Sequence, residues 1–155
     1  MENSIEVTNL SKSYGLKEAV KNINFEVKEN QIIGLLGPNG CGKTTTIGML
    51  LGLLKPSNGE IIVNGMKIEE NRINILKKIN FISPYIELPK KLTVKQNLIV
   101  YGKLYSVRNL KSRIEYLASK LRLEDLLSKI TGELSSGQKN RVSLAKALIN
   151  EPVVL

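Results

Sequence analysis

The sequence contains no histidine, and it has a single cysteine, Cys41, among its 155 residues. One cysteine cannot form a disulfide within the chain. Without histidine there is also no Cys/His cluster that could hold zinc. These absences exclude a disulfide framework and make a structural metal unexpected.

Long apolar runs are missing as well. No stretch reaches the ~18 uninterrupted apolar residues that a membrane-spanning helix needs, and residues 1–10 are neither apolar nor basic enough for a secretory signal. We therefore expect a cytoplasmic chain. Its composition, 42% hydrophobic and 24% charged, is ordinary for one globular domain. No internal repeat or low-complexity tract interrupts the chain, so we expect any division to be a lobe within that domain.

Charge is unevenly distributed along the chain, whose formal net charge is +9. Residues 1–85 carry 10 Lys and Arg against 8 Asp and Glu, whereas residues 86–150 carry 13 against 5. A basic surface fits nucleic-acid phosphates or an anionic membrane, and it equally fits a set of solvated helices. Charge alone does not choose among these.

The first half of the sequence has the texture of strands. Residues 5–10 and 22–27 alternate apolar and polar positions, which predicts half-buried antiparallel strands. Residues 31–36 are more continuously apolar, which predicts a strand covered on both faces. Residues 60–63, closed by Asn64-Gly65, predict a short strand, and residues 80–83 predict another buried one.

Helical patterns follow and then dominate. A helix is expected to begin near Lys43, and residues 69–78 are expected to be helical. Strand and helix alternate here, which favours an α/β architecture. On the first helix, the predicted apolar stripe comprises four residues: Ile47, Leu50, Leu51 and Leu54.

Beyond Pro89 the pattern is almost entirely helical. Thr93 and Gln96 have capping-box spacing at the start of one helix. Ser135 or Ser136 is expected to cap a later helix, which Pro152 prevents from continuing. Residues 153–155 look like the beginning of a strand. The apolar positions of the first two helices are Val94, Leu98, Tyr101 and Tyr105, and Leu110, Ile114, Leu117 and Leu121.

One segment between a predicted strand and a predicted helix satisfies the phosphate-loop pattern G-x-x-x-x-G-K-[ST]. Its glycines let successive backbone N–H groups point at phosphate oxygens, and the following helix adds the positive end of its dipole. Lys43 would bring a full charge to the β and γ phosphates, and Thr44 would offer a hydroxyl to Mg²⁺. The segment reads Gly37, Pro38, Asn39, Gly40, Cys41, Gly42, Lys43 and Thr44.

Three further points concern the interpretation of this loop. Asn39 and Thr45 are predicted to be supporting contacts. Cys41 is a candidate reactive thiol, but a tolerated small residue is the preferred interpretation. The alternative for the whole segment is a Gly-rich turn that enters a core helix, with Lys43 merely solvated.

A second motif narrows the class of phosphate-loop proteins to which the chain can belong. Leu134, Ser135, Ser136, Gly137 and Gln138 resemble the Leu-Ser-Gly-Gly-Gln signature of ABC ATPases, and residues 139–148 with Pro152 resemble its continuation. Residues 56–65 are similar to the P-x-x-G-x-I-x-x-x-G link of that family. The resemblance covers essentially the whole chain.

The resemblance implies an α/β fold: a P-loop NTPase (RecA-like) core, an N-terminal antiparallel β subdomain and an α-helical signature subdomain, incomplete at the C-terminus. It places the β lobe and phosphate-loop core in residues 1–85 and the helical signature lobe in residues 86–150. Residues 151–155 would start the Walker B strand. The chain is accordingly expected to be a partial ABC ATPase domain.

The resemblance also implies ligands and partners. Tyr14 would stack on the adenine ring of ATP, with an ordinary core or turn tyrosine as the alternative. Residues 134–138 would face the ATP of a second ATP-binding domain in a head-to-tail dimer, with a simple helix cap as the alternative. ATP and Mg²⁺ are the implied cofactors. An exporter's transmembrane permease is the implied partner, which places the chain peripherally on the inner face of the cell membrane.

The sequence departs from the family pattern in three places. Ser136 replaces the first signature glycine. Pro84 occupies the position of the usual glutamine, so either Ser83 or Tyr85 replaces that side chain or the glutamine's role is lost. The chain also stops at Leu155, before the Asp and Glu that hold Mg²⁺ and orient the attacking water, and we therefore expect negligible hydrolysis by this chain alone.

The sequence is also compatible with two other functions. One is a soluble ABC-type ATPase that acts on ribosomes or nucleic acid through the basic second half. The scattered basic residues and the aromatic content of 5% argue against it, and no nucleic-acid partner is expected. The other is a remnant that binds nucleotide without hydrolysing it.

Overall fold

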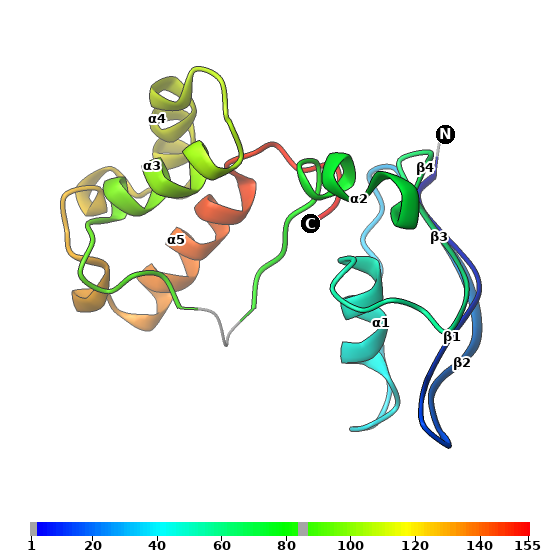
Figure 1. Cartoon of the computed structure of the whole chain (residues 1–155). Helices are drawn as coiled ribbons and strands as arrows, with labels where there is room; N and C mark the ends of the chain where they lie inside the picture. Colours follow the sequence, from blue (N-terminus) through cyan, green and yellow to red (C-terminus); the bar gives the residue numbers. More distant parts are fainter. Residues whose placement is uncertain (1–2, 84–86) are drawn as a thin grey trace. The chain divides into compact units, whose positions relative to one another are not determined.

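A computed structural model describes residues 3–83 and 87–155. The chain divides into two compact units, residues 1–76 and 77–155 (Figure 1). The sequence predicts a boundary between two lobes after residue 85. That boundary stays a prediction, because residues 84–86 lie outside the described residues.

The first unit contains a four-stranded antiparallel sheet with strand order β2-β1-β3-β4. β1 pairs with β2 and with β3, which confirms the antiparallel strands that alternation predicts. Val7, Leu10 and Ile61 are almost fully buried, so one face of the sheet forms a core. The strands are β1 (Asn3–Tyr14), β2 (Lys17–Lys28), β3 (Asn58–Val63) and β4 (Met66–Lys67).

Helix α1 (Lys43–Leu50) begins where the sequence predicts, but its buried face differs from the predicted stripe. The buried side chains are Thr46 and Met49, while Ile47 is 47% exposed. The predicted stripe assumed a helix that reaches Leu54. The chain instead leaves the helix after Leu50 and turns at Gly52, whose φ is +62°. Helix α2 (Ile68–Leu76) then follows β4, with a kink at Asn71.

Two predicted buried strands are wrong. Residues 31–36 form no strand and pair with none among the described residues, and Ile32 and Leu36 are 101% and 91% exposed. Residues 80–83 are likewise not a strand; next to them, Ile79 makes a single parallel bridge to Val154. A strand buried on both faces needs a neighbouring strand to pair with and a layer of structure over each face. Continuous apolarity indicates that a segment can be buried, but it does not supply those neighbours.

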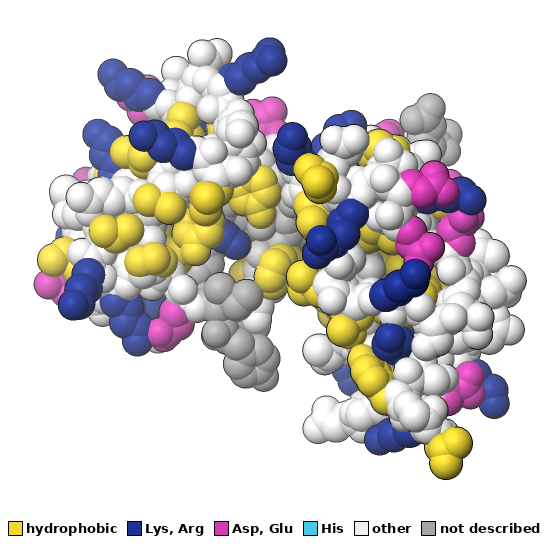
Figure 2. All heavy atoms as spheres, viewed as in Figure 1, with side chains coloured by type: hydrophobic (Ala, Val, Ile, Leu, Met, Phe, Trp, Pro, Cys, Tyr) yellow, Lys and Arg dark blue, Asp and Glu magenta, His cyan; other side chains and the backbone are white. Residues whose placement is uncertain are grey.

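All of the chain's net charge belongs to the second unit. Residues 1–76 contain 8 Lys and Arg and 8 Asp and Glu, whereas residues 77–155 contain 15 and 6, for a net charge of +9. On the face shown in Figure 2, the Lys and Arg side chains stand singly or in small groups among neutral surface. The basic excess is therefore spread over helices and does not form one dense patch on this face.

The second unit is helical: α3 (Val94–Leu104), α4 (Leu110–Leu121) and α5 (Ser136–Leu148), with short 3-10 turns η1 (Glu124–Leu126) and η2 (Thr131–Glu133). Thr93 caps α3 and Ser135 caps α5, each in a capping box with a glutamine three residues later. These observations confirm the predicted helix starts. Together with the sheet of the first unit, the helices confirm the α/β class.

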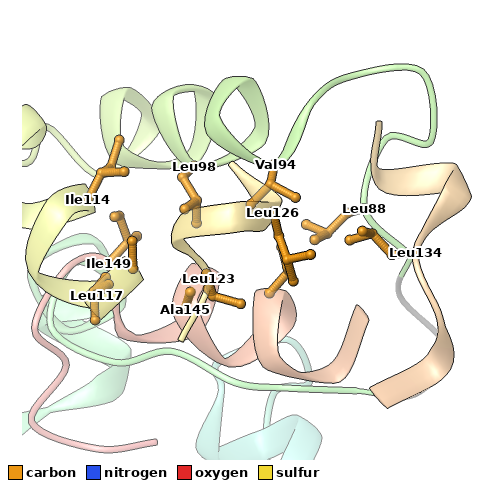
Figure 3. Packing of buried hydrophobic residues seen from close by; sticks show 12 residues of the cluster. Leu88, Val94, Leu98, Ile114, Leu117, Leu123, Leu126, Leu134, Ala145 and Ile149 are labelled. Atoms are coloured by element: carbon orange, nitrogen blue, oxygen red, sulfur yellow. The ribbon is translucent and has the colours of Figure 1, made fainter. Parts of the chain in front are cut away.

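A single apolar cluster holds these helices together (Figure 3). Leu98 of α3, Leu117 of α4 and Ala145 of α5 are all at most 1% exposed, so each helix contributes one face to it. Leu88 and Leu134 extend the cluster to the loop before α5. Leu134 thereby anchors the residues that follow it, including Ser135.

Candidate functional site

The phosphate-loop segment folds as a turn into α1. Gly42 is the N-cap of that helix and has φ +95°, in the left-handed region. A Cβ at Gly42 would lie closer than 3.0 Å to the Ala19 carbonyl oxygen of β2. Since side chains do not tolerate that approach, this position requires glycine. The start of α1, with its free backbone N–H groups, is thereby held close to β2.

Lys43 closes the loop with its own charge. Its Nζ donates to the carbonyl oxygens of Gly37 at 2.6 Å and of Pro38 at 2.8 Å, and it lies 3.8 Å from the Cys41 Sγ. An ammonium group has three N–H donors, so it can hold several acceptors at once. The positive charge therefore lies within the curve of the loop, where an anion would meet it.

A pocket of about 340 Å³ opens beside this loop, between the end of the β1–β2 hairpin and the start of α1. Tyr14 lines it with a ring that is 51% exposed, and the Lys12 Nζ lies 5.3 Å from that ring. A half-exposed aromatic ring can stack on a planar base. The lining residues that the sequence predicts are Tyr14, Asn39, Gly40, Gly42, Lys43, Thr44 and Thr45.

The sequence missed two lining residues, Lys17 and Ala19. Both lie on β2, and Lys17 pairs directly with Tyr14 across the hairpin. The signal was present, because a turn at Gly15 brings the next few residues back beside Tyr14. Lys17 adds a second ammonium to the pocket besides Lys43, which suits a ligand with several negative charges.

Three predicted residues, Gly37, Pro38 and Cys41, do not line this pocket. Gly37 and Pro38 contribute carbonyl oxygens to Lys43 instead. Cys41 is exposed and lines a second hollow of about 440 Å³, which Leu35 and Leu36 also line. Its thiol therefore lies within the loop, close to Gly37 and the Lys43 Nζ, and does not line the pocket that contains Tyr14.

Hydroxyl groups at the start of α1 are divided between the helix and the pocket. The Thr46 Oγ1 donates to the Gly42 carbonyl at 3.0 Å and is buried. Thr44 is exposed and lines the pocket, so its hydroxyl is free to face a ligand. No group of three His, Cys, Asp or Glu in residues 3–83 and 87–155 could hold a metal by itself. One hydroxyl fits Mg²⁺ as a ligand when water and phosphate oxygens complete the shell.

The signature segment forms the start of α5. Leu134 is buried, while Ser135, Ser136 and Gly137 are exposed. The Ser135 Oγ accepts from the Gln138 backbone N–H at 3.3 Å, and the Gln138 side chain accepts from the Ser135 N–H at 2.9 Å. This capping box fixes the first turn and leaves its serines at the surface.

Basic side chains stand near this turn. The Lys90 Nζ lies 2.7 Å from the Glu87 carboxylate. The hydrogen bond and the charge of Lys90 lower the pKa of Glu87, and the charge of Lys139 on α5 lowers it further. Pro84 and Tyr85, which the sequence singled out beside Ser83, lie outside the described residues.

The ABC transporter family model matches residues 20–155. This chain belongs to the ABC transporter family. Among curated members, the Nod factor export ATP-binding protein I of Rhizobium johnstonii is 39% identical over 98% of this chain and 50% of its own length. The sulfate/thiosulfate import ATP-binding protein CysA of Synechocystis sp. is also 39% identical, over 98% of this chain and 43% of its own. The chain thus spans about half the length of these curated relatives.

A solved structure supports the same family. The dimeric structure of MJ0796, a bacterial ABC transporter cassette, matches with a TM-score of 0.79 and 28% identity over 96% of this chain and 70% of that chain. In the part of the chain that the structure describes, no helix has the length and apolarity needed to cross a membrane.

Proposed function

We propose that this chain binds ATP and Mg²⁺ at the loop of residues 37–44, as the ATP-binding part of an ABC transporter. The observation that carries the proposal is the pocket beside Gly42, where Tyr14, Lys43 and Thr44 line one space. An aromatic ring, an ammonium and a hydroxyl match a base, a phosphate chain and a hydrated cation.

The chain's own residues divide the binding task. The ring of Tyr14 stacks on adenine, and the Lys43 ammonium moves its bonds from the loop carbonyls to phosphate oxygens. Backbone N–H groups at the start of α1 add the positive end of its dipole. Mg²⁺, when bound through Thr44, supplies neutralisation of the phosphate charge.

The signature residues 134–138 act, in this proposal, on the ATP held by a second ATP-binding domain in a head-to-tail dimer. Gly137 supports this, because a Cβ there would meet nothing within 4 Å. Glycine in a helix costs roughly 1 kcal/mol relative to alanine. Packing within the described residues gives no reason for a glycine at this position. The close approach of a partner's phosphate to the exposed turn would give one.

The whole transporter would use ATP hydrolysis to drive a separate transmembrane permease, with this subunit peripheral to the inner face of the membrane. Export is the proposed direction, and the match to the Nod factor export protein supports it. The match to a sulfate import protein has the same identity. A transport assay of the complete system, and not sequence identity, therefore decides the direction.

The decisive experiment removes the charge at the loop. We expect Lys43→Ala to weaken ATP binding at least about tenfold, because a charge-assisted hydrogen bond to phosphate is worth about 1.5–3 kcal/mol. Isothermal titration calorimetry with MgATP measures this. Lys55→Ala is the control, since the Lys55 side chain is 83% exposed and lines neither of the two pockets. Unchanged affinity in a folded Lys43→Ala chain would contradict the proposed site.

A further inference from the structure

A buried asparagine outside the site connects to the loop that precedes the signature. Asn97 of α3 is 0% exposed. Its Nδ2 donates to the carbonyl oxygens of Pro89 at 3.1 Å and Thr93 at 3.2 Å, and to the Thr131 Oγ1 at 2.8 Å. Two of these acceptors are backbone carbonyls, which cannot donate, so they fix which end of the amide faces them.

Thr131 is the other half of this contact. It is 2% exposed and is the first residue of η2, the 3-10 turn that leads to the signature. The Leu134 N–H donates back to the Thr131 carbonyl at 3.4 Å, so the turn joins the two residues directly. Ser135, the N-cap of α5, comes next. The Asn97 amide is thus one hydrogen bond and one short turn away from the signature.

Backbone pairing places the rest of this loop against the start of α3. The Thr131 N–H donates to Leu92 O at 2.9 Å, and the Gly132 N–H donates to Lys90 O at 3.0 Å. Thr93 and Ile130 form an antiparallel bridge. On the far side of the turn, the Leu134 and Leu88 side chains point toward each other in the core (Figure 3). The Asn97–Thr131 hydrogen bond adds a buried link between two polar side chains to this assembly.

We propose that Asn97 and Thr131 are positioning residues for the signature: their buried hydrogen bond sets where η2 ends and therefore where Ser135 presents its hydroxyl and the first turn of α5. This inference rests on the proposed function, in which that turn contacts a partner's ATP. Burial strengthens the dependence of η2 on this bond, because the Asn97 amide in the core has no water molecule that could replace Thr131 as its acceptor.

A matched pair of variants separates the hydroxyl from the packing at Thr131. Thr131→Val keeps the branched shape and removes the acceptor, whereas Thr131→Ser keeps the acceptor and removes the methyl group. The readout is amide hydrogen exchange in the full chain without nucleotide. It compares the Gln138 and Lys139 amides, which bond to Ser135, with the amides of α4.

We expect Thr131→Val to speed exchange at Gln138 and Lys139 about five- to tenfold, roughly what the loss of one buried hydrogen bond gives, with α4 unchanged. Thr131→Ser should stay near the original rate. Equal rates in both variants, a faster rate in Thr131→Ser, or an equal acceleration in α4 would each overturn the proposal. The last result would mean that the bond only stabilises the unit.

A second variant tests the donor side. Asn97→Asp places a carboxylate oxygen against the Pro89 and Thr93 carbonyls, and we expect it to exceed the effect of Thr131→Val on the same amides. If it does not fold, the Thr131 pair decides alone. None of these measurements involves ATP, so a failure of the proposed nucleotide site would appear in the calorimetry of Lys43→Ala and leave the exchange result readable.

Discussion

Single residues in the proposed phosphate loop contribute to the fold and, in the proposed function, also to ligand binding. Lys43 is the clearest case: its ammonium bonds to the Gly37 and Pro38 carbonyls and lies at the pocket that Tyr14 lines. These two bonds hold the partly exposed ammonium against the loop. In the proposed function, a phosphate chain would offer better acceptors than neutral carbonyls, so ATP binding would exchange weaker hydrogen bonds of Lys43 for stronger ones.

Glycine substitutions separate backbone strain from close approach in this loop. Gly40 and Gly42 have φ of +84° and +95°, but a Cβ at Gly40 meets nothing within 4 Å, whereas one at Gly42 meets Ala19. We expect Gly40→Ala to lower the free energy of unfolding by about 1 kcal/mol, from strain alone. Gly42→Ala should lower it by roughly 2 kcal/mol or more, since the clash is added. Urea unfolding of both variants measures the difference. Equal losses of unfolding free energy would show that the backbone at Ala19 moves to accommodate the added Cβ.

Elements whose causes are local in the sequence were predictable. The capping residues Thr93 and Ser135 fix their helices through bonds to residues three positions away, so sequence spacing contains the whole cause. The β1–β2 hairpin is similar, because alternation and a turn at Gly15 lie within one stretch. The phosphate loop lies at the predicted start of α1 and the signature segment at that of α5, and the roles of both in binding stay predictions.

Elements whose causes are distant were not predictable. Residues 31–36 have the composition of a buried strand, but their conformation depends on strands that must pair with them from elsewhere. The buried face of α1 depended on where the helix ends, and Gly52 decided that. Lys17 and Ala19 reach the pocket only through the register of the hairpin. The sequence pattern indicates which structures a segment can form, and the segments that pack or pair with it determine which one forms.

The capping box of α3 offers a test at this scale. Thr93→Ala removes the side-chain oxygen that accepts from the Gln96 N–H at 3.1 Å. We expect the free energy of unfolding to fall by about 1 kcal/mol, because an N–H at the helix start loses its partner. Chemical denaturation followed by far-UV circular dichroism measures it. Thr93→Ser keeps the oxygen and serves as the control; if it loses as much as Thr93→Ala, the methyl group and not the cap is responsible.

At the scale of the molecule, charge distinguishes the two units. The first is neutral and contains the proposed nucleotide pocket, while residues 77–155 carry the net charge of +9. The basic residues are spread over several helices, which favours long-range attraction over a shaped binding site. Such attraction suits a broad anionic surface.

This distribution makes a prediction about salt. We expect the chain to bind vesicles that contain phosphatidylserine at low ionic strength and to lose most of that binding by about 0.5 M NaCl, because the Debye length then falls well below 10 Å. Sedimentation with vesicles measures it, and neutral phosphatidylcholine vesicles are the control. Tighter binding to single-stranded RNA than to the anionic vesicles, at matched salt, would instead favour the nucleic-acid alternative.

The exposed apolar segment of residues 31–36 has a consequence for the handling of purified protein. It presents consecutive apolar side chains on a backbone that pairs with no strand among the described residues. An exposed apolar segment that pairs with no strand can pair with the same segment of other copies, and the resulting aggregates grow with protein concentration. Purified chain should therefore precipitate on concentration or storage unless a complementary strand is provided, and dilute preparations will give the most reproducible measurements.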